Sequence, residues 1–365
     1  MKLNTIFQNK KVIITGHTGF KGSWLSVWLH SLGADVYGIS MDVPTNPSHF
    51  DSLEISKIIN DIRIDIRDLI SLKDKIHSIK PDFLFHLAAQ PLVRFSYQDP
   101  LLTYSTNVMG TINVLECLRN LTQECVAVII TSDKCYDNVE WVWGYRETDA
   151  LGGPDPYSSS KGMAELAIKS YIKSFFNNSD SLVKIGIGRA GNVIGGGDWA
   201  DDRIVPDCVK AWSKNEVVSL RNPMATRPWQ LVLEPLSGYL NLSMALKENF
   251  KLHGEAFNFG PASENSQTVL ELVKEMKKHW DQVKFEDNSK DYDGPYESGL
   301  LKLNCDKALF FLKWKAILDF ETTIKMTSEW YKEYYKPSMN TYDFTLKQIQ
   351  DYTKIAQSKK LLWAK

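Results

Sequence analysis

The stretch Val12-Ile13-Ile14-Thr15-Gly16-His17-Thr18-Gly19-Phe20-Lys21-Gly22 decides the fold, because an apolar run is followed directly by a glycine-rich turn. The β-branched run predicts a buried strand, and apolar residues at helical spacing predict a helix starting near Ser23. Glycines at 16, 19 and 22 would let the backbone approach a pyrophosphate, whose charge the N–H groups at the helix start would hold. The sequence therefore predicts a dinucleotide-binding loop; the alternative is a plain strand-to-helix turn.

Short apolar runs alternate with longer amphipathic segments as far as about Arg189. The runs cover residues 12–14, 35–39, 83–85, 126–130 and 184–188. Runs this short, apolar on both faces, are typical of parallel strands covered by helices on both sides. We therefore expect an α/β fold, a Rossmann-type doubly wound parallel sheet with a smaller C-terminal substrate-binding domain.

Beyond Arg189 the sequence is richer in Gly, Pro, Trp and charged residues, which predicts the second domain. A helical pattern over residues 232–246 and a strand at 257–260 predict that the chain then returns to the sheet. The expected division is an NAD-binding Rossmann domain over residues 1–190, rejoined around 229–260, and a mainly substrate-binding domain over residues 191–365.

The composition excludes several function classes. The chain has 365 residues, of which 43% are hydrophobic, and its formal net charge is -1. A balanced charge provides no field to attract nucleic acid or an anionic membrane, and no apolar stretch is long enough to span a bilayer. The five cysteines show no C-x-x-C spacing, so we expect no metal site and no disulfide framework. A cytoplasmic enzyme acting on a small molecule is the expectation.

Further cofactor contacts are expected where strands end, because open α/β sheets bind ligands at the carboxyl ends of their strands. Asp42 follows the second strand, where an acidic residue would bind a ribose hydroxyl and select NAD over NADP; it is otherwise an ordinary loop aspartate. Asp65-Ile66 and Leu87-Ala88-Ala89-Gln90 occupy corresponding positions. The small side chains at 88 and 89 would let a dinucleotide lie close to the backbone.

Tyr157 and Lys161 are the expected centre of the chemistry. Their i, i+4 spacing places both on one face of a helix that begins after Pro154 and Pro156. An ammonium there would lower the pKa of the phenol and make it a base. The pair alone could be an ordinary surface pair, but Ser132, at the end of the strand over 126–130, completes an arrangement suited to alcohol oxidation.

Four motifs in order carry a resemblance to a known family: TGHTGFKG (15–22), LAAQ (87–90), TSDK (131–134) and YSSSK (157–161). Together they resemble the extended short-chain dehydrogenase/reductase family. With RAGNVIGGGDWADDRIVPD (189–207), the pattern resembles its nucleotide-sugar 4,6-dehydratases, in particular the branch that acts on CDP-glucose. The likeness covers nearly the whole chain.

The resemblance implies roles for single residues. Ser132 would hydrogen-bond the sugar O4, Tyr157 would remove its proton, and Lys161 would hold the nicotinamide ribose. Asn107 would support the lysine through water; it could otherwise be a helix-capping amide. The family also implies NAD as cofactor, a nucleotide sugar as substrate and a homodimer.

Asp133 and Lys134 indicate the type of reaction. Epimerases of this fold have small uncharged residues there, so a charged pair argues for elimination, and the lysine matches the CDP-glucose branch. Lys134 would take the C5 proton, and Asp133 would protonate the departing C6 hydroxyl. Lys134 could instead point to solvent. As a cation near the nicotinamide, it would also weaken the retention of NAD.

Arginines after the sheet are expected to bind the diphosphate of the substrate, since a guanidinium contacts phosphate in bidentate fashion. Arg189, Arg203 and Arg227 are the candidates, and the resemblance adds Asn192. Leu231 follows the segment Arg227-Pro228-Trp229-Gln230 in place of a more usual histidine. Trp199 would stack on the base or pack between the domains.

Other functions stay open on the sequence alone. Another nucleotide-sugar 4,6-dehydratase would have the same motifs. A nucleotide-sugar 4-epimerase would need only Ser132, Tyr157 and Lys161. A non-catalytic NAD-binding protein is the alternative from a different class.

Overall fold

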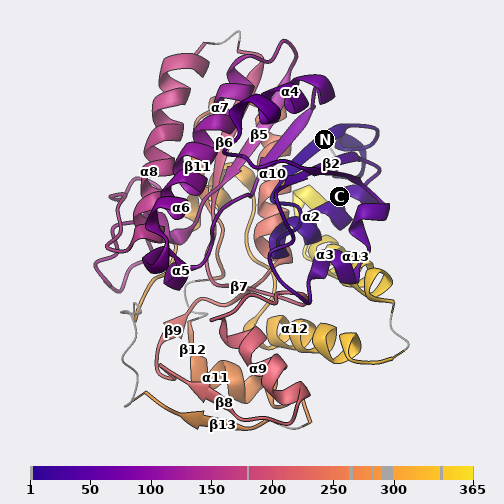
Figure 1. Ribbon diagram of the computed structural model, residues 1–365, viewed down its shortest axis with the longest axis vertical. Coiled ribbons are helices and arrows are strands. Elements are labelled where there is room, and N and C mark those ends of the chain that lie inside the picture. The colour runs from indigo at the N-terminus through magenta and orange to yellow at the C-terminus, as the bar shows by residue number, and fades with distance from the viewer. Residues whose placement is uncertain are drawn as a thin grey trace.

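A seven-stranded parallel sheet forms the centre of the computed structural model, which describes residues 3–178, 181–262, 266–281, 283–289, 299–337 and 340–364 (Figure 1). The strand order is β11-β6-β5-β4-β1-β2-β3, and every pairing within it is parallel. The strands are β1 (Lys11–Thr15), β2 (Asp35–Ser40), β3 (Asn60–Arg63), β4 (Phe83–His86), β5 (Cys125–Ile130), β6 (Val183–Arg189) and β11 (Ala256–Asn258). The expected doubly wound sheet is confirmed.

Successive residues of each strand face two separate cores. Val12 and Ile14 pack with α2 (Phe20–Ser31) and α10 (Leu233–Glu248), whereas Ile13 packs with the helices of the opposite face. Those helices are α4 (Leu69–Ile79), α7 (Gly110–Arg119) and α8 (Pro156–Tyr171). The sheet is therefore buried on both faces, which explains why its strands are continuously apolar.

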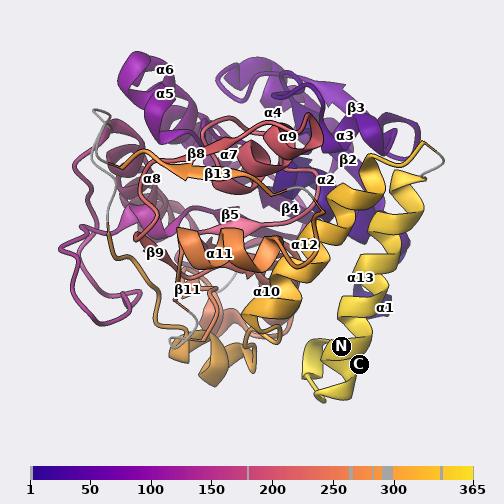
Figure 2. The ribbon, with the colours of Figure 1, turned by 90° about the horizontal axis from the view of Figure 1, so that it is seen from below.

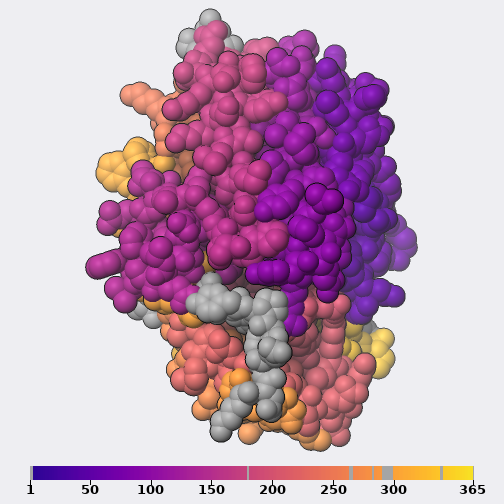
Figure 3. Space-filling view, turned by 60° about the vertical axis from the view of Figure 1, so that its left-hand side comes forward, coloured from indigo at the N-terminus to yellow at the C-terminus, as the bar shows by residue number. Residues whose placement is uncertain are grey.

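The chain after β6 builds a smaller body below the sheet and then returns to it (Figures 1 and 2). In the part of the chain that the structure describes, the lower body includes the short strands β8 (Val218–Leu220), β9 (Thr226–Arg227), β12 (Gln267–Thr268) and β13 (Phe285–Asp287) and the helices α9 (Ile204–Ser213) and α11 (Val269–Met276). Between these segments, α10 covers the sheet and β11 joins its edge. In Figure 3 the larger upper body is mostly indigo to magenta and the smaller lower one is mostly pink to orange. The domain boundaries themselves stay a prediction.

The C-terminal helices α12 (Phe320–Tyr334) and α13 (Thr341–Ser358) join the two bodies. They share the core of α2 and α10. Among the helices of the described residues, none is long and apolar enough to cross a membrane.

The run Gly195-Gly196-Gly197, after β7 (Val193–Ile194), is packed too tightly for side chains. A Cβ at Gly196 would lie 1.9 Å from Cγ of Trp330 on α12, and one at Gly197 would lie 2.2 Å from Cδ2 of His49. The indole of Trp24 donates to the Gly196 carbonyl at 2.8 Å. The loop that follows is therefore anchored between the N-terminal and C-terminal parts of the chain.

Candidate active site

A cavity of about 670 Å³ opens at the carboxyl ends of the parallel strands. Residues following β1, β2, β3, β4, β5 and β6 line it, together with residues of the loop 197–203. Many of the residues expected to bind cofactor or substrate lie on its wall: Gly16, Thr18, Gly19, Phe20, Lys21, Gly22, Asp42, Asp65, Ile66, Leu87, Ala88, Ala89, Gln90, Ser132, Tyr157, Lys161, Trp199 and Arg203. Those outside the lining are His17, Asn107, Asp133, Lys134, Asn192 and Arg227.

The glycine-rich loop forms the floor beside α2. Gly16 has a φ of 77°, and a Cβ there would lie 2.7 Å from the backbone nitrogen of Ala88. A Cβ at Gly22 would lie 2.1 Å from the Gly16 carbonyl oxygen. Only glycine fits this conformation at both positions, so the loop stays tight against α2 and leaves backbone at the cavity wall.

His17 lies beneath this loop. Its Nε2 is 2.9 Å from Oδ1 of Asp61, its Nδ1 is 2.9 Å from the Ser40 hydroxyl, and burial lowers its pKa. Gly38 provides the space, since a Cβ there would lie 2.3 Å from the ring. The His17 side chain therefore does not face the cavity: the ring ties the loop to β2 and β3. A contact through its backbone stays a prediction.

Lys21 is the cation of the loop that does line the cavity. Burial, assisted by nearby Arg203, lowers its pKa to about 8. Within the described ranges its ammonium has no hydrogen-bond or ion-pair partner, so it is available to a ligand.

At the far end of the cavity, Asp42 and Asp65 follow β2 and β3. The Asp42 carbonyl accepts a hydrogen bond of 2.6 Å from Thr18, which ties this turn to the glycine-rich loop. The Asp65 carboxylate is held by the guanidinium of Arg67 at 2.9 and 2.6 Å, and this hydrogen bonding lowers its pKa. Both aspartates line the cavity at strand ends, and their contact with an adenosine stays a prediction.

Tyr157 and Lys161 lie on the first turns of α8. Asp155 caps this helix by accepting the Ser158 N–H, and Pro156 opens it. The Lys161 ammonium is 6.0 Å from the centroid of the Tyr157 ring. Burial raises the pKa of Tyr157 to about 12, while a hydrogen bond with Ser132 acts in the opposite direction. Burial also lowers the pKa of Lys161 to about 8. The expected lowering of the Tyr157 pKa by Lys161 is not seen, because burial dominates both groups.

Asp133 and Lys134 begin a short 3-10 turn, η3 (Asp133–Cys135), directly after Ser132. Ser132 donates to Oδ1 of Asp133 at 2.9 Å and accepts the Lys134 N–H at 3.2 Å. Asp133 is buried, and a Cβ at Gly191 would lie 1.9 Å from its carboxylate. The carboxylate thus adjoins the hydroxyl of Ser132. Lys134 is half-buried, and in the described part of the chain its ammonium has no bonding partner.

Asn107 lies behind the catalytic helix in a π-helical turn, η2 (Ser105–Met109). Its amide donates to the Ser160 hydroxyl at 2.9 Å and its carbonyl oxygen accepts the Gln90 N–H at 2.8 Å. It therefore joins α8 to the segment after β4. Its link to Lys161 through water stays a prediction.

The candidate substrate residues differ in how they are held. Arg203 lines the cavity and pairs with Asp198 at 2.7 Å. Asn192 donates to Asp133 at 3.4 Å, while Arg227 donates to the Thr226 carbonyl at 2.8 Å. The diphosphate contacts of these residues stay predictions.

Trp199 packs against three tyrosines of α12 and its C-terminal end. Its ring centroid is 5.1 Å from Tyr331, 4.9 Å from Tyr334 and 6.3 Å from Tyr335. Of the two expected roles of Trp199, stacking on the base or packing within the protein, the structure shows packing. Stacking on a base has no direct support, although the side chain also borders the cavity.

Arg189 does not face the cavity, and its expected diphosphate contact is wrong. Both carboxylate oxygens of Glu165 bind its guanidinium at 2.8 Å, and all these groups are buried. This ion pair was not predicted. The i, i+4 spacing from Lys161 to Glu165 placed the glutamate on the catalytic face of α8, but no pattern links residues 165 and 189 along the chain.

Comparisons with known proteins show the family of this chain. A family model described as GDP-mannose 4,6 dehydratase matches residues 13–327. CDP-glucose 4,6-dehydratase of Salmonella typhimurium is 47% identical over 333 residues, covering 89% of this chain and 91% of that protein.

Two solved structures share the fold. UDP-glucose 4-epimerase of Thermotoga maritima with UDP-glucose has a TM-score of 0.76 at 20% identity, covering 89% of this chain and all of that one. dTDP-glucose 4,6-dehydratase of Bacillus anthracis in complex with NAD has a TM-score of 0.70 at 20% identity, covering 88% of this chain and 96% of that one.

Proposed function

The chain belongs to the GDP-mannose 4,6 dehydratase family, and from this premise we propose that it is an NAD-dependent enzyme converting CDP-D-glucose to CDP-4-keto-6-deoxy-D-glucose. The observation that carries the proposal is the position of Asp133. Its buried carboxylate accepts a hydrogen bond from Ser132, which lines the cavity together with Tyr157, and its charge acts on the Tyr157 phenol. An acid beside the oxidation site is what dehydration requires and epimerisation does not. The CDP-glucose assignment is supported by the 47% identical relative.

The residues of the cavity fit NAD. The glycine-rich loop leaves bare backbone at the start of α2, and the small Ala88 adjoins Gly16. Residues 16–22 would hold the pyrophosphate, Asp42, Asp65 and Ile66 the adenosine, and Lys161 the nicotinamide ribose. Residues 87–90 would lie along the dinucleotide, and Asn107 would steady Lys161. When bound, NAD supplies the acceptor for the C4 hydride and later its donor to C6.

Different side chains carry out the successive proton transfers. Ser132 orients the sugar O4, and Tyr157 removes its proton. Ketone formation at C4 makes the C5 proton acidic, and Lys134 takes it. Asp133 protonates the C6 hydroxyl as it leaves, so that water is lost. Tyr157 must release its own proton first, and the hydrogen bond with Ser132 and the positive charge of Arg203 favour that ionisation.

The substrate nucleotide would bind at the side of the lower body. Arg203 at the cavity wall is the strongest candidate for the diphosphate, because it lines the cavity and its guanidinium pairs with Asp198 through Nη1. Asn192, Arg227 and Trp199 complete the proposed substrate contacts. The proposed domains are residues 1–190 with 229–260 for the cofactor, and the rest mainly for the substrate.

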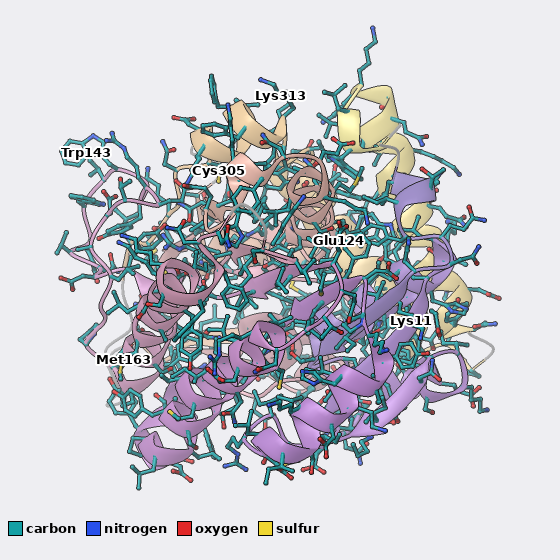
Figure 4. All side chains as sticks on the ribbon, turned by 90° about the horizontal axis from the view of Figure 1, so that it is seen from above. Lys11, Glu124, Trp143, Met163, Cys305 and Lys313 are labelled. Carbon is teal, nitrogen blue, oxygen red and sulfur yellow. The ribbon has the colours of Figure 1, made fainter. Side chains whose placement is uncertain are left out.

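The proposal includes a homodimer in the cytoplasm. Apolar side chains on α6 (Pro100–Tyr104) and α8 are exposed, among them Leu101 and Leu166. Met163 of α8 lies at the periphery of the molecule in Figure 4. Such faces favour association through helices. All five cysteines are free, which supports a reducing compartment.

The test is incubation with NAD and a panel of CDP-, UDP-, dTDP- and GDP-hexoses, followed by mass spectrometry. We expect loss of one water from CDP-glucose, and no loss with Tyr157→Phe. Water loss from a different nucleotide sugar would move the substrate assignment to that base. Conversion to an isomer of unchanged mass would identify a 4-epimerase instead.

A further inference from the structure

Two parts of the active site must be held together although they lie on different elements. Tyr157 and Lys161 belong to α8, whereas Ser132, Asp133 and Lys134 belong to the turn after β5. One buried ion pair connects the two. Glu165 follows Lys161 by one helical turn, and its carboxylate binds Nε and Nη2 of Arg189, each at 2.8 Å. Arg189 ends β6, the strand beside β5.

Each half of this ion pair holds one end of the turn. At the N-terminal end, the Thr131 hydroxyl donates to Oε1 of Glu165 at 2.5 Å. At the other end, Nη1 of Arg189 donates to the Tyr136 hydroxyl at 2.7 Å. The Tyr136 hydroxyl in turn donates to Asn258 of β11 at 2.8 Å, and the guanidinium lies 4.9 Å from the Tyr136 ring centroid. Residues 131–136 are therefore fastened at both ends.

A buried ion pair is a poor device for stability, because desolvation offsets most of the attraction between its charges. Such a pair is well suited to positioning two elements relative to each other, because a bidentate guanidinium fixes both the distance and the orientation between them. We propose that Glu165 and Arg189 are positioning residues that set Asp133 and Lys134 against Tyr157 and Lys161. This inference rests on the proposed function, since it assigns the turn to oxidation and elimination.

The two ends of the turn adjoin groups for different steps. Thr131 precedes Ser132, which orients the alcohol for oxidation. Tyr136 lies two residues after Lys134, which removes the C5 proton. Loosening the Thr131 end should slow oxidation more, and loosening the Tyr136 end should slow elimination more, because misplaced groups lose rate steeply with distance.

Thr131→Val and Tyr136→Phe separate the two ends. Each removes one buried hydroxyl and keeps the shape of the side chain. The holoenzyme with NAD would be assayed on CDP-glucose carrying deuterium at C4 or at C5, and the two isotope effects on kcat compared. Thr131→Val is expected to raise the C4 effect relative to the C5 effect, and Tyr136→Phe to do the reverse. Both should lower kcat by on the order of tenfold or more.

Matched controls are Thr327→Val and Tyr145→Phe. The Thr327 hydroxyl is buried within α12. The Tyr145 ring stacks on that of Tyr136 at 5.1 Å and is kept in the variant, while its hydroxyl bonds residues 138 and 139, so neither removed hydroxyl bonds the ion pair. Their isotope effects should equal those of the wild type. A purely structural role for residues 165 and 189 would lower thermal stability in the test variants without changing the ratio of the two effects.

An unchanged ratio in both test variants, or a change of the same sign in both, overturns the inference. Each variant tests one end of residues 131–136 independently. If one variant does not fold, the ratio of the two isotope effects in the other variant still decides the inference. A wild type that releases no water from CDP-glucose contradicts the proposed function instead, so the two failures are distinguishable.

Discussion

Lys134 is the residue whose role most needs a direct test. Its backbone is fixed by Ser132, while its half-buried ammonium has no partner in the described chain and is free to meet the substrate. Lys134→Met should lower dehydration about 10²–10⁴-fold, the usual contribution of a general base. C4 oxidation should continue, so reduced cofactor should accumulate in single-turnover absorbance.

The control for this prediction is Lys169→Met, which removes an exposed lysine of the same helix that carries Tyr157. It should leave turnover unchanged. Wild-type water loss and C5 exchange with deuterated solvent in Lys134→Met would assign the base to Asp133 or to water.

For single residues, the sequence predicts which of them come together at the cavity, but not the direction in which each side chain points. Motif order is enough to place Ser132, Tyr157 and Lys161 around one cavity, because strand ends and helical spacing converge there. It misassigns His17 and Arg189, because a position in a loop or at a strand end does not specify which side of the backbone faces a ligand. The partners of these two residues, Asp61 and Glu165, are 44 and 24 positions away.

Among the elements, α10 carries a buried carboxylate that holds the C-terminal segments in place. Oε1 of Glu234 accepts the N–H groups of Ile317 and Leu318 at 2.8 Å, and Oε2 accepts the Tyr352 hydroxyl at 2.7 Å. Burial raises the pKa of Glu234 to about 7. The folded protein thus binds a proton more tightly than the unfolded chain, whose glutamate titrates near its usual value.

The consequence is a pH-dependent stability with a defined sign. The contribution of Glu234 is complete below about pH 4.5 and is lost as pH rises through about 7, by about 3 kcal/mol at most. Glu234→Gln, which cannot titrate, should flatten the fall in unfolding free energy over that interval. Urea unfolding at several pH values measures it. Exposed Glu321 of α12 is the control, and a Glu321→Gln profile that matched Glu234→Gln would contradict this origin of the slope.

The long elements are predictable because their periodicity is imposed by burial on a sheet. All five expected runs lie in β1, β2, β4, β5 and β6, and the expected return to the sheet at residues 257–260 overlaps β11. The two- and three-residue strands of the lower body are too short to show any period. Their positions depend on tertiary contacts and not on a local sequence pattern.

For the whole molecule, the exposed apolar face of α6 and α8 predicts association. Leu166 is 56% exposed and Leu101 is 81% exposed, although both are large and apolar. Leu166→Glu would bury a charge in a dimer through this face and should yield a monomer in light scattering. Val217→Glu, which places the same charge at an exposed apolar site just before β8, should stay dimeric. A dimer that persists in Leu166→Glu would place the interface elsewhere.

The glycines at 195–197 have a practical consequence for engineering. The loop they begin forms one wall of the substrate cavity, so it is a natural segment to exchange between relatives when a new sugar nucleotide is wanted. Yet its backbone fits only against Trp330 and His49, which lie far away in the chain. A chimera that exchanges this loop should therefore also exchange α12 and the segment around residue 49, because the three parts pack against one another.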